Sequence, residues 1–73
     1  MKFTLYAENG EAGYCKRLGV FATMEAAESW VEAEEQKETW PEGCDAVLVE
    51  GEHGDAAPDD ARTWGLMDGW EEY

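Results

Sequence analysis

The sequence predicts an α+β fold: a small, mostly antiparallel sheet of three strands in the order β-β-α-β, one helix packed on a face, and an irregular C-terminal tail. Three observations support this. Two strand-like segments flank the turn dipeptide Asn9-Gly10, an Ala- and Glu-rich stretch without Gly or Pro follows, and a short apolar run comes after it. A helix laid across one face of such a sheet buries the apolar side of both.

The length and composition predict a single domain that covers residues 1–73. A chain of 73 residues has room for one hydrophobic core. Its hydrophobic content of 44% and its four tryptophans exceed what a disordered acidic chain carries. We therefore expect the chain to fold on its own.

Residues 1–22 are predicted to form a β-hairpin. In the first strand, Phe3, Leu5 and Ala7 alternate with Thr4 and Tyr6, which is the pattern of a half-buried strand. Asn9-Gly10 tolerates the positive φ angles of a hairpin turn. A second strand is predicted from Tyr14 to Ala22, with Leu18 and Val20 on one face and Cys15, Arg17 and Phe21 on the other.

Residues 23–38 are predicted to form an acidic helix and residues 45–50 a third strand. Thr23 is a suitable N-cap, and Trp40-Pro41-Glu42-Gly43 ends the helix in a turn. The apolar stripe of the helix consists of Met24, Ala27, Trp30 and Val31. The continuous apolar run from Ala46 to Val49 indicates an interior strand, buried on both faces.

Residues 51–73 form the predicted aromatic and acidic tail. Frequent glycines indicate loops with one or two short helical turns, with Pro58 at a helix start. We expect Trp64 to join the core. For Trp70 and Tyr73 two alternatives stay open, because these side chains either fold back over the sheet or form a docking edge.

The net charge of −13 is unevenly distributed. Residues 1–22 hold two acidic and three basic residues, whereas residues 23–45 hold eight acids against Lys37 and residues 46–73 hold eight against Arg62. This charge disfavours direct binding to nucleic acid or to an anionic membrane. No apolar run suits a membrane span or a signal peptide, so we expect a cytoplasmic protein with Cys15 and Cys44 reduced.

The predicted helix carries a stripe of glutamates, and we expect this stripe to bind a partner. Its members follow the spacing of one helix face: Glu25, Glu28, Glu32 and Glu35. Further candidate contact residues are Glu34, Glu38, Asp59, Asp60, Trp70, Glu71 and Glu72. Like charges at these spacings destabilise a helix, so selection for stability alone would place lysines between them. The alternative that the stripe is only a solvated outer face, without a binding role, stays open.

Motifs for catalysis, metals and cofactors are missing. His53 is the single histidine, and no nucleophile has a base and an orienting group in a known pattern. The aspartates Asp55, Asp59 and Asp60 lack calcium-loop spacing, and the two cysteines lack a paired zinc signature. We therefore predict neither an enzyme nor a metal- or cofactor-binding protein.

In composition and layout, a short Glu-rich chain with an acidic helix on a small sheet resembles the phage-encoded anti-CRISPR proteins and related DNA mimics. The resemblance implies a stoichiometric inhibitor, in the host cytoplasm, that occupies the basic nucleic-acid-binding surface of a partner such as a CRISPR effector complex. A second hypothesis is an acidic adaptor that docks a host protein through its aromatic tail. A third is halophilic adaptation, and the oligomeric state is left open.

Overall fold

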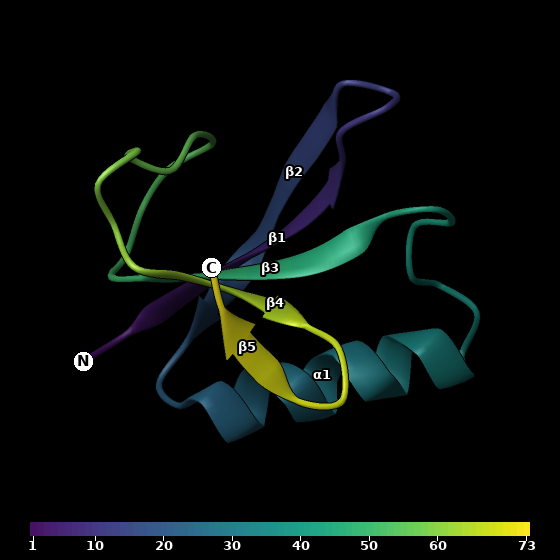
Figure 1. Ribbon diagram of the computed structural model, residues 1–73. Coiled ribbons are helices and arrows are strands. Elements are labelled where there is room, and N and C mark those ends of the chain that lie inside the picture. Colours follow the sequence, from purple (N-terminus) through teal and green to yellow (C-terminus); the bar gives the residue numbers. More distant parts are fainter.

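In the computed structural model, which describes residues 1–73, one helix packs on an antiparallel sheet of five strands (Figure 1). The elements are β1 (Phe3–Asn9), β2 (Tyr14–Phe21), α1 (Met24–Gln36), β3 (Asp45–Glu50), β4 (Thr63–Leu66) and β5 (Trp70–Glu72). The strands lie in the order β2-β1-β3-β4-β5, with every neighbouring pair antiparallel. The α+β class is as predicted, and β3 is the central strand.

The number of strands and the form of the tail were predicted wrongly. In place of an irregular tail with a helix at Pro58, the chain forms the β4–β5 hairpin, and three strands become five. These strands have four and three residues, too few for a readable alternation of polar and apolar positions. They exist because β4 pairs with the interior strand β3, where Val47 lies opposite Gly65.

A bulge in the β1–β2 hairpin changes which side chains of β2 share a face. Leu5 lies opposite Gly19 and Tyr6 opposite Arg17, so Leu18 is the extra residue. Leu18 and Phe21 therefore both pack against the core beneath the helix. The predicted alternation placed them on opposite faces, which is wrong because a bulge shifts the side-chain register by one residue.

The helix begins where the sequence indicates. The Thr23 hydroxyl accepts a hydrogen bond from the Ala26 amide at 3.1 Å, which caps the first turn. Ala27 and Val31 are fully covered by the sheet, and the Trp30 ring lies 5.9 Å from the Phe21 ring of β2. This helix is too short and too polar to cross a membrane, and the chain has no other.

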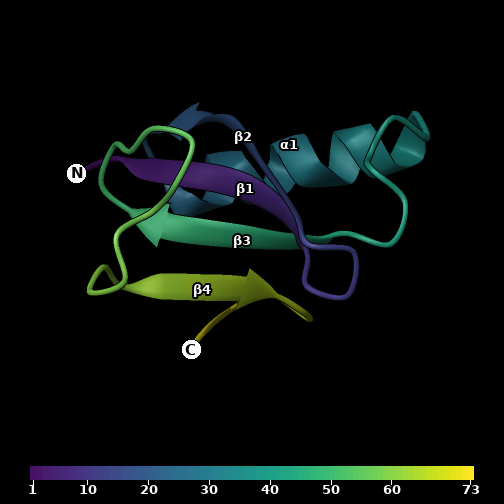
Figure 2. The same cartoon turned by 90° about the horizontal axis from the view of Figure 1, so that it is seen from above.

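The main core lies between α1 and the sheet (Figure 2). Leu5 and Leu48 are its fully buried centre, and the Trp64 ring meets Phe3 edge-on at 5.8 Å, which confirms the prediction that Trp64 joins the core. Trp70 also folds back, since its indole N–H donates to the Met24 carbonyl oxygen at 2.9 Å. The hairpin β4–β5 is thus bound to the start of the helix.

The opposite face of the sheet is covered by residues 51–62, named here the strap. Figure 2 shows the strap crossing the N-terminal half of β1. Thr4 and Tyr6, which are 0% and 2% exposed, lie beneath it. The prediction that β1 is half-buried is therefore wrong. Side chains of β1 and β2 fasten the strap with four hydrogen bonds. Thr4 Oγ1 donates to the Gly51 oxygen at 2.7 Å and accepts from the His53 amide at 3.0 Å, Tyr6 Oη donates to the Gly54 oxygen at 2.8 Å, and Arg17 Nε donates to the His53 oxygen at 2.7 Å.

Candidate protein-binding surface

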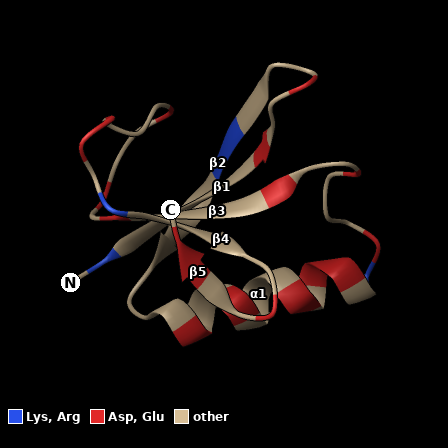
Figure 3. Ribbon diagram, in the orientation of Figure 1, with Lys and Arg blue, Asp and Glu red and all other residues tan.

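The glutamate stripe, Glu25, Glu28, Glu32 and Glu35, follows the spacing of one flank of α1, and Figure 3 shows acidic positions along the length of this helix. Trp30 on the other flank contacts β2, whereas Glu35 lies near Leu66 and Met67 at the end of β4. The stripe therefore faces the side of the helix next to the β4–β5 hairpin. Of its four members, Glu28 is half-buried and the other three are exposed.

None of the four stripe carboxylates is paired with a cation. The ion pairs of the chain join Lys2 to Glu52, Lys37 to Glu34, and Arg62 to both Glu50 and Glu72. Arg17 donates to a backbone oxygen of the strap, and Lys16 forms no ion pair. No basic side chain of the protein therefore pairs with a carboxylate of the stripe.

Glu34 and Glu38 lie near the stripe but are not part of it. The Glu34 carboxylate accepts a hydrogen bond from the Thr39 hydroxyl at 2.7 Å and lies 3.9 Å from the Lys37 ammonium. Glu38 follows the C-cap residue in a left-handed conformation with φ of 61°. Both residues belong to the segment that ends the helix, and Glu38 is exposed there.

The acidic residues predicted as contacts in the tail do not extend the stripe. Asp59 and Asp60 are part of the strap, on the opposite face of the sheet. Glu71 lies opposite Gly65, and it points away from the helix because its neighbour Trp70 packs against the helix-side core. The predicted residues therefore do not form one continuous surface.

Glu72 is neutralised within the protein. Its carboxylate accepts hydrogen bonds from Arg62 Nε at 2.7 Å and from Arg62 Nη2 at 3.2 Å. The hydrogen bond from the guanidinium lowers the pKa of Glu72, and the same contact raises the pKa of Arg62. This carboxylate is consequently less available to a partner than those of the stripe.

The two aromatic residues near the C-terminus differ in their surroundings. Trp70 is half-buried against the core, which leaves little of it for docking. Tyr73 is 74% exposed, with its ring over the backbone of Gly65, where any side chain would clash. Partial burial, with the nearby Asp45 and Glu8 carboxylates, raises the pKa of Tyr73. Tyr73 is therefore the more accessible of the pair.

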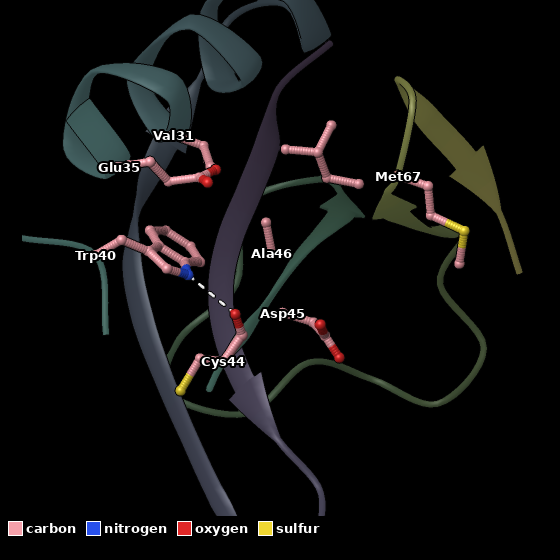
Figure 4. A pocket seen from close by; sticks show the side chains of 8 residues that line it. Val31, Glu35, Trp40, Cys44, Asp45, Ala46 and Met67 are labelled. Carbon is pink, nitrogen blue, oxygen red and sulfur yellow. Dashed lines mark hydrogen bonds between the residues drawn. The ribbon is translucent and has the colours of Figure 1, made fainter. Parts of the chain in front are cut away.

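A hollow between α1 and the β4–β5 turn was not predicted. Its volume is about 280 Å³, and its lining consists of Val31, Glu35, Trp40, Cys44, Asp45, Ala46, Leu66 and Met67 (Figure 4). The indole N–H of Trp40 donates to the Cys44 oxygen at 2.9 Å, which holds the ring at the edge of the hollow. Met67, in the β4–β5 turn, is 68% exposed. The lining residues come from distant parts of the sequence, so no local pattern predicts the hollow. The one local signal is Trp40, a large apolar residue in the predicted turn after the helix.

The remaining groups of interest are the two cysteines and the residues that could bind a metal ion. Both cysteines are free thiols, and burial together with the Glu8 carboxylate raises the pKa of Cys15, which keeps that thiol protonated at neutral pH. No three His, Cys, Asp or Glu side chains are grouped so as to hold a metal ion. Every buried side-chain nitrogen and oxygen has a hydrogen-bond partner.

The charged helix flank therefore adjoins a hollow that is lined in part by apolar side chains. No family model, no curated protein and no solved structure matches the chain.

Proposed function

We propose that this protein is a stoichiometric inhibitor that presents the glutamate stripe of α1 to the basic nucleic-acid-binding surface of a partner protein. A CRISPR effector complex is the kind of partner that the resemblance in composition and layout implies. The observation that carries the proposal is the absence of any cationic partner for Glu25, Glu28, Glu32 and Glu35, although the chain has five basic residues.

The spacing of the stripe suits a surface that binds phosphates. With a rise of about 1.5 Å per residue, carboxylates three or four residues apart are separated by about 5 Å along the helix. Phosphates of one DNA strand advance about 3.4 Å of axis each, so the two charge densities are of the same order. A groove lined with Lys and Arg would attract either of them and would release its bound counterions on binding.

Stability alone does not account for the stripe. Like charges three or four residues apart destabilise a helix by a few tenths of a kcal/mol per pair, and an interleaved lysine would remove that penalty. Instead, α1 is held by its Thr23 cap and by the burial of Ala27 and Val31 on its inner face. The inner face thus stabilises the helix while the outer flank carries uncompensated charge, as expected if the charge has a binding role.

The decisive experiment compares two double charge reversals with the same change in net charge. A partner is first captured from host lysate on the immobilised protein, identified by mass spectrometry and purified. Its binding to labelled nucleic acid is then measured with increasing amounts of wild type, of Glu28→Lys/Glu32→Lys, and of the control Asp59→Lys/Asp60→Lys. The control pair lies in the strap, on the other face of the sheet.

The stripe variant should compete at least about tenfold more weakly than wild type, because it sets like charges against a basic groove. The strap variant should retain most of the competition. Equal losses in both variants would show that net charge alone matters, and unchanged competition by the stripe variant would exclude the stripe as the contact. Circular dichroism of both variants checks that the fold is intact.

The adaptor hypothesis has one observation in its favour, the exposure of Met67 and Tyr73 at 68% and 74%. Deleting the chain from Trp64 onward does not test it, because Trp64 belongs to the core and β4 pairs with β3. The test is Met67→Ser/Tyr73→Ser, which leaves the stripe untouched. An adaptor that docks through these residues would lose partner binding in this variant and keep it in the stripe reversal.

A further inference from the structure

The hollow between α1 and the β4–β5 turn is continuous with the glutamate stripe, because Glu35 belongs to both. We infer that it receives one arginine side chain of the partner protein. This inference rests on the proposed function and specifies how a basic partner engages the C-terminal end of the stripe.

The size of the hollow suits a single side chain. Its volume of about 280 Å³ is at the lower limit of small-molecule sites, which span ~300–1,000 Å³. Apolar side chains form part of its wall, with Val31 from the helix, Ala46 from β3 and Leu66 from β4. A long side chain with an aliphatic stem would cover these residues without filling an extended groove.

The charge around the hollow selects a cation. Figure 4 shows the Glu35 carboxylate and the Trp40 ring on the same side of the hollow, with Met67 on the opposite side. Glu35 has no ion-pair partner, so its charge is available to an incoming group. The Asp45 carboxylate points away from the Trp40 ring (Figure 4), as expected for a residue that alternates with the helix-side residue Ala46.

An arginine fits this combination better than a lysine. The guanidinium group is planar and weakly hydrated, so it stacks on an aromatic ring while it pairs with a carboxylate. The chain already contains such an arrangement. The Arg62 guanidinium carbon lies 5.2 Å from the centre of the Trp64 ring, and its Nε lies 2.7 Å from Glu72. Trp40 and Glu35 offer the same two groups without an internal arginine between them.

The test requires no partner protein, because a short peptide supplies the side chain. Acetyl-Gly-Arg-Gly-amide is titrated into the labelled protein, with the lysine and citrulline peptides as comparisons. Nuclear magnetic resonance follows the Trp40 indole N–H and the Met67 methyl group. The arginine peptide should shift both signals and bind more tightly than the lysine peptide, with citrulline weakest because it has the shape of arginine without the charge.

Matched variants locate the binding. Glu35→Gln should weaken the arginine peptide by about two- to fivefold, the effect of one exposed ion pair, whereas Glu25→Gln at the far end of the stripe should not. Met67→Ala, at an exposed site that should not affect folding, should also reduce the affinity. Equal effects of the two glutamine variants, or equal binding of the arginine and citrulline peptides, would overturn the inference.

Two further outcomes also count against it. Equal binding of arginine and lysine would show a site for positive charge in general. Shifts of Trp40 that depend on protein concentration without peptide would show that a second copy of the chain occupies the hollow. The peptide titration and the competition assay use different probes, so the two hypotheses can fail separately. Arginine binding in the hollow can be absent while the stripe reversal still weakens competition, and arginine can bind in the hollow while the stripe reversal has no effect.

Discussion

The two faces of the sheet are covered in different ways. On one face, α1 and the sheet share an apolar core of seven buried residues, which include Leu5, Leu48 and Trp64. On the other face, the strap covers an apolar cluster of three buried residues and the buried Thr4, and side chains of β1 and β2 hold its backbone by hydrogen bonds. The helix is thus attached mainly by apolar burial and the strap mainly by specific polar contacts.

This difference shows where the protein can carry surplus charge. Apolar burial depends on the inner side of α1 and sets no requirement for its outer flank, where the glutamates lie. The strap contributes its own carbonyl groups to its attachment, so its path over β1 is set by the positions of Thr4, Tyr6 and Arg17. Each covering can therefore be weakened separately.

Leu48→Ala should have the largest effect, because it removes a fully buried side chain from the centre of the helix-side core. We expect a loss of about 2–5 kcal/mol in the free energy of unfolding, from lost burial and from the cavity left behind. Urea denaturation followed by tryptophan fluorescence measures it. Met67→Ala, at an exposed position, is the control. A loss below that of the strap variants would contradict the view that this face is the more strongly held.

Thr4→Val should have the next largest effect, on the strap face. The Thr4 hydroxyl donates to the Gly51 oxygen at 2.7 Å and accepts from the His53 amide at 3.0 Å, and valine has nearly the same shape without either bond. Two partly buried backbone groups would lose this partner, at a cost of about 1–3 kcal/mol. Thr39→Val, at an exposed hydroxyl, is the control. Hydrogen exchange should accelerate at the His53 amide, and unchanged exchange there would show that the strap is held by other contacts.

Tyr6→Phe removes the hydroxyl and keeps the ring beneath the strap, so it measures the contribution of the hydroxyl to stability. At neutral pH we expect a loss of about 0.5–1.5 kcal/mol, since only the bond to the Gly54 oxygen disappears. Burial raises the pKa of Tyr6 above its ordinary value of 10.0, so the folded state holds the phenolic proton more tightly than the unfolded state. This part of the stability is complete below pH 10.0 and is lost as the pH rises through the folded pKa.

The difference between wild type and Tyr6→Phe should therefore shrink above pH 10.0. Thermal unfolding of both proteins at neutral and alkaline pH provides the measurement. Tyr14→Phe, at a half-exposed residue whose hydroxyl makes no hydrogen bond within the protein, should resemble wild type at both pH values. A difference that stays constant with pH would show that the pKa of Tyr6 is the same in the folded and unfolded states, against the effect of burial.

Glu32→Lys should have the smallest effect on stability and the opposite sign. It replaces repulsion along the stripe with attraction between the new lysine and both Glu28 and Glu35, which stabilises a helix by about 0.2–0.5 kcal/mol per pair. The gain should fall as salt screens the exposed charges. Thermal unfolding at low and high salt measures it, with Glu32→Gln as the charge-removing control. A loss of stability would indicate that Glu32 makes a favourable contact in the folded protein.

Local signals in the sequence were sufficient for the helix and the first three strands. Thr23 can cap a helix by itself, and the apolar run from Ala46 to Val49 indicates burial whatever covers it. The strap, the bulge at Leu18 and the β4–β5 hairpin depend on contacts between distant residues. Tyr6 looks like an exposed position in an alternating strand until Gly54 is known to lie above it.

The candidate site follows the same division. That Glu25, Glu28, Glu32 and Glu35 share one flank is a consequence of helix geometry and could be predicted. That Lys37 pairs with Glu34 is a local i,i+3 contact, whereas the absence of a cation from any other element near the stripe depends on tertiary structure. The hollow requires Trp40 and Met67, which are far apart in the sequence, to line one site, and no local pattern indicates that arrangement.

The central place of β3 also bears on the order in which the molecule can assemble. The β1–β2 and β4–β5 hairpins each join strands that are neighbours in the sequence. In contrast, β3 pairs with β1 across the whole intervening segment that contains β2 and α1, and it also pairs with β4. Closing that long stretch of chain reduces its entropy before any pairing contact compensates for it. Docking of β3 between the hairpins is accordingly the step that we expect to govern the refolding rate.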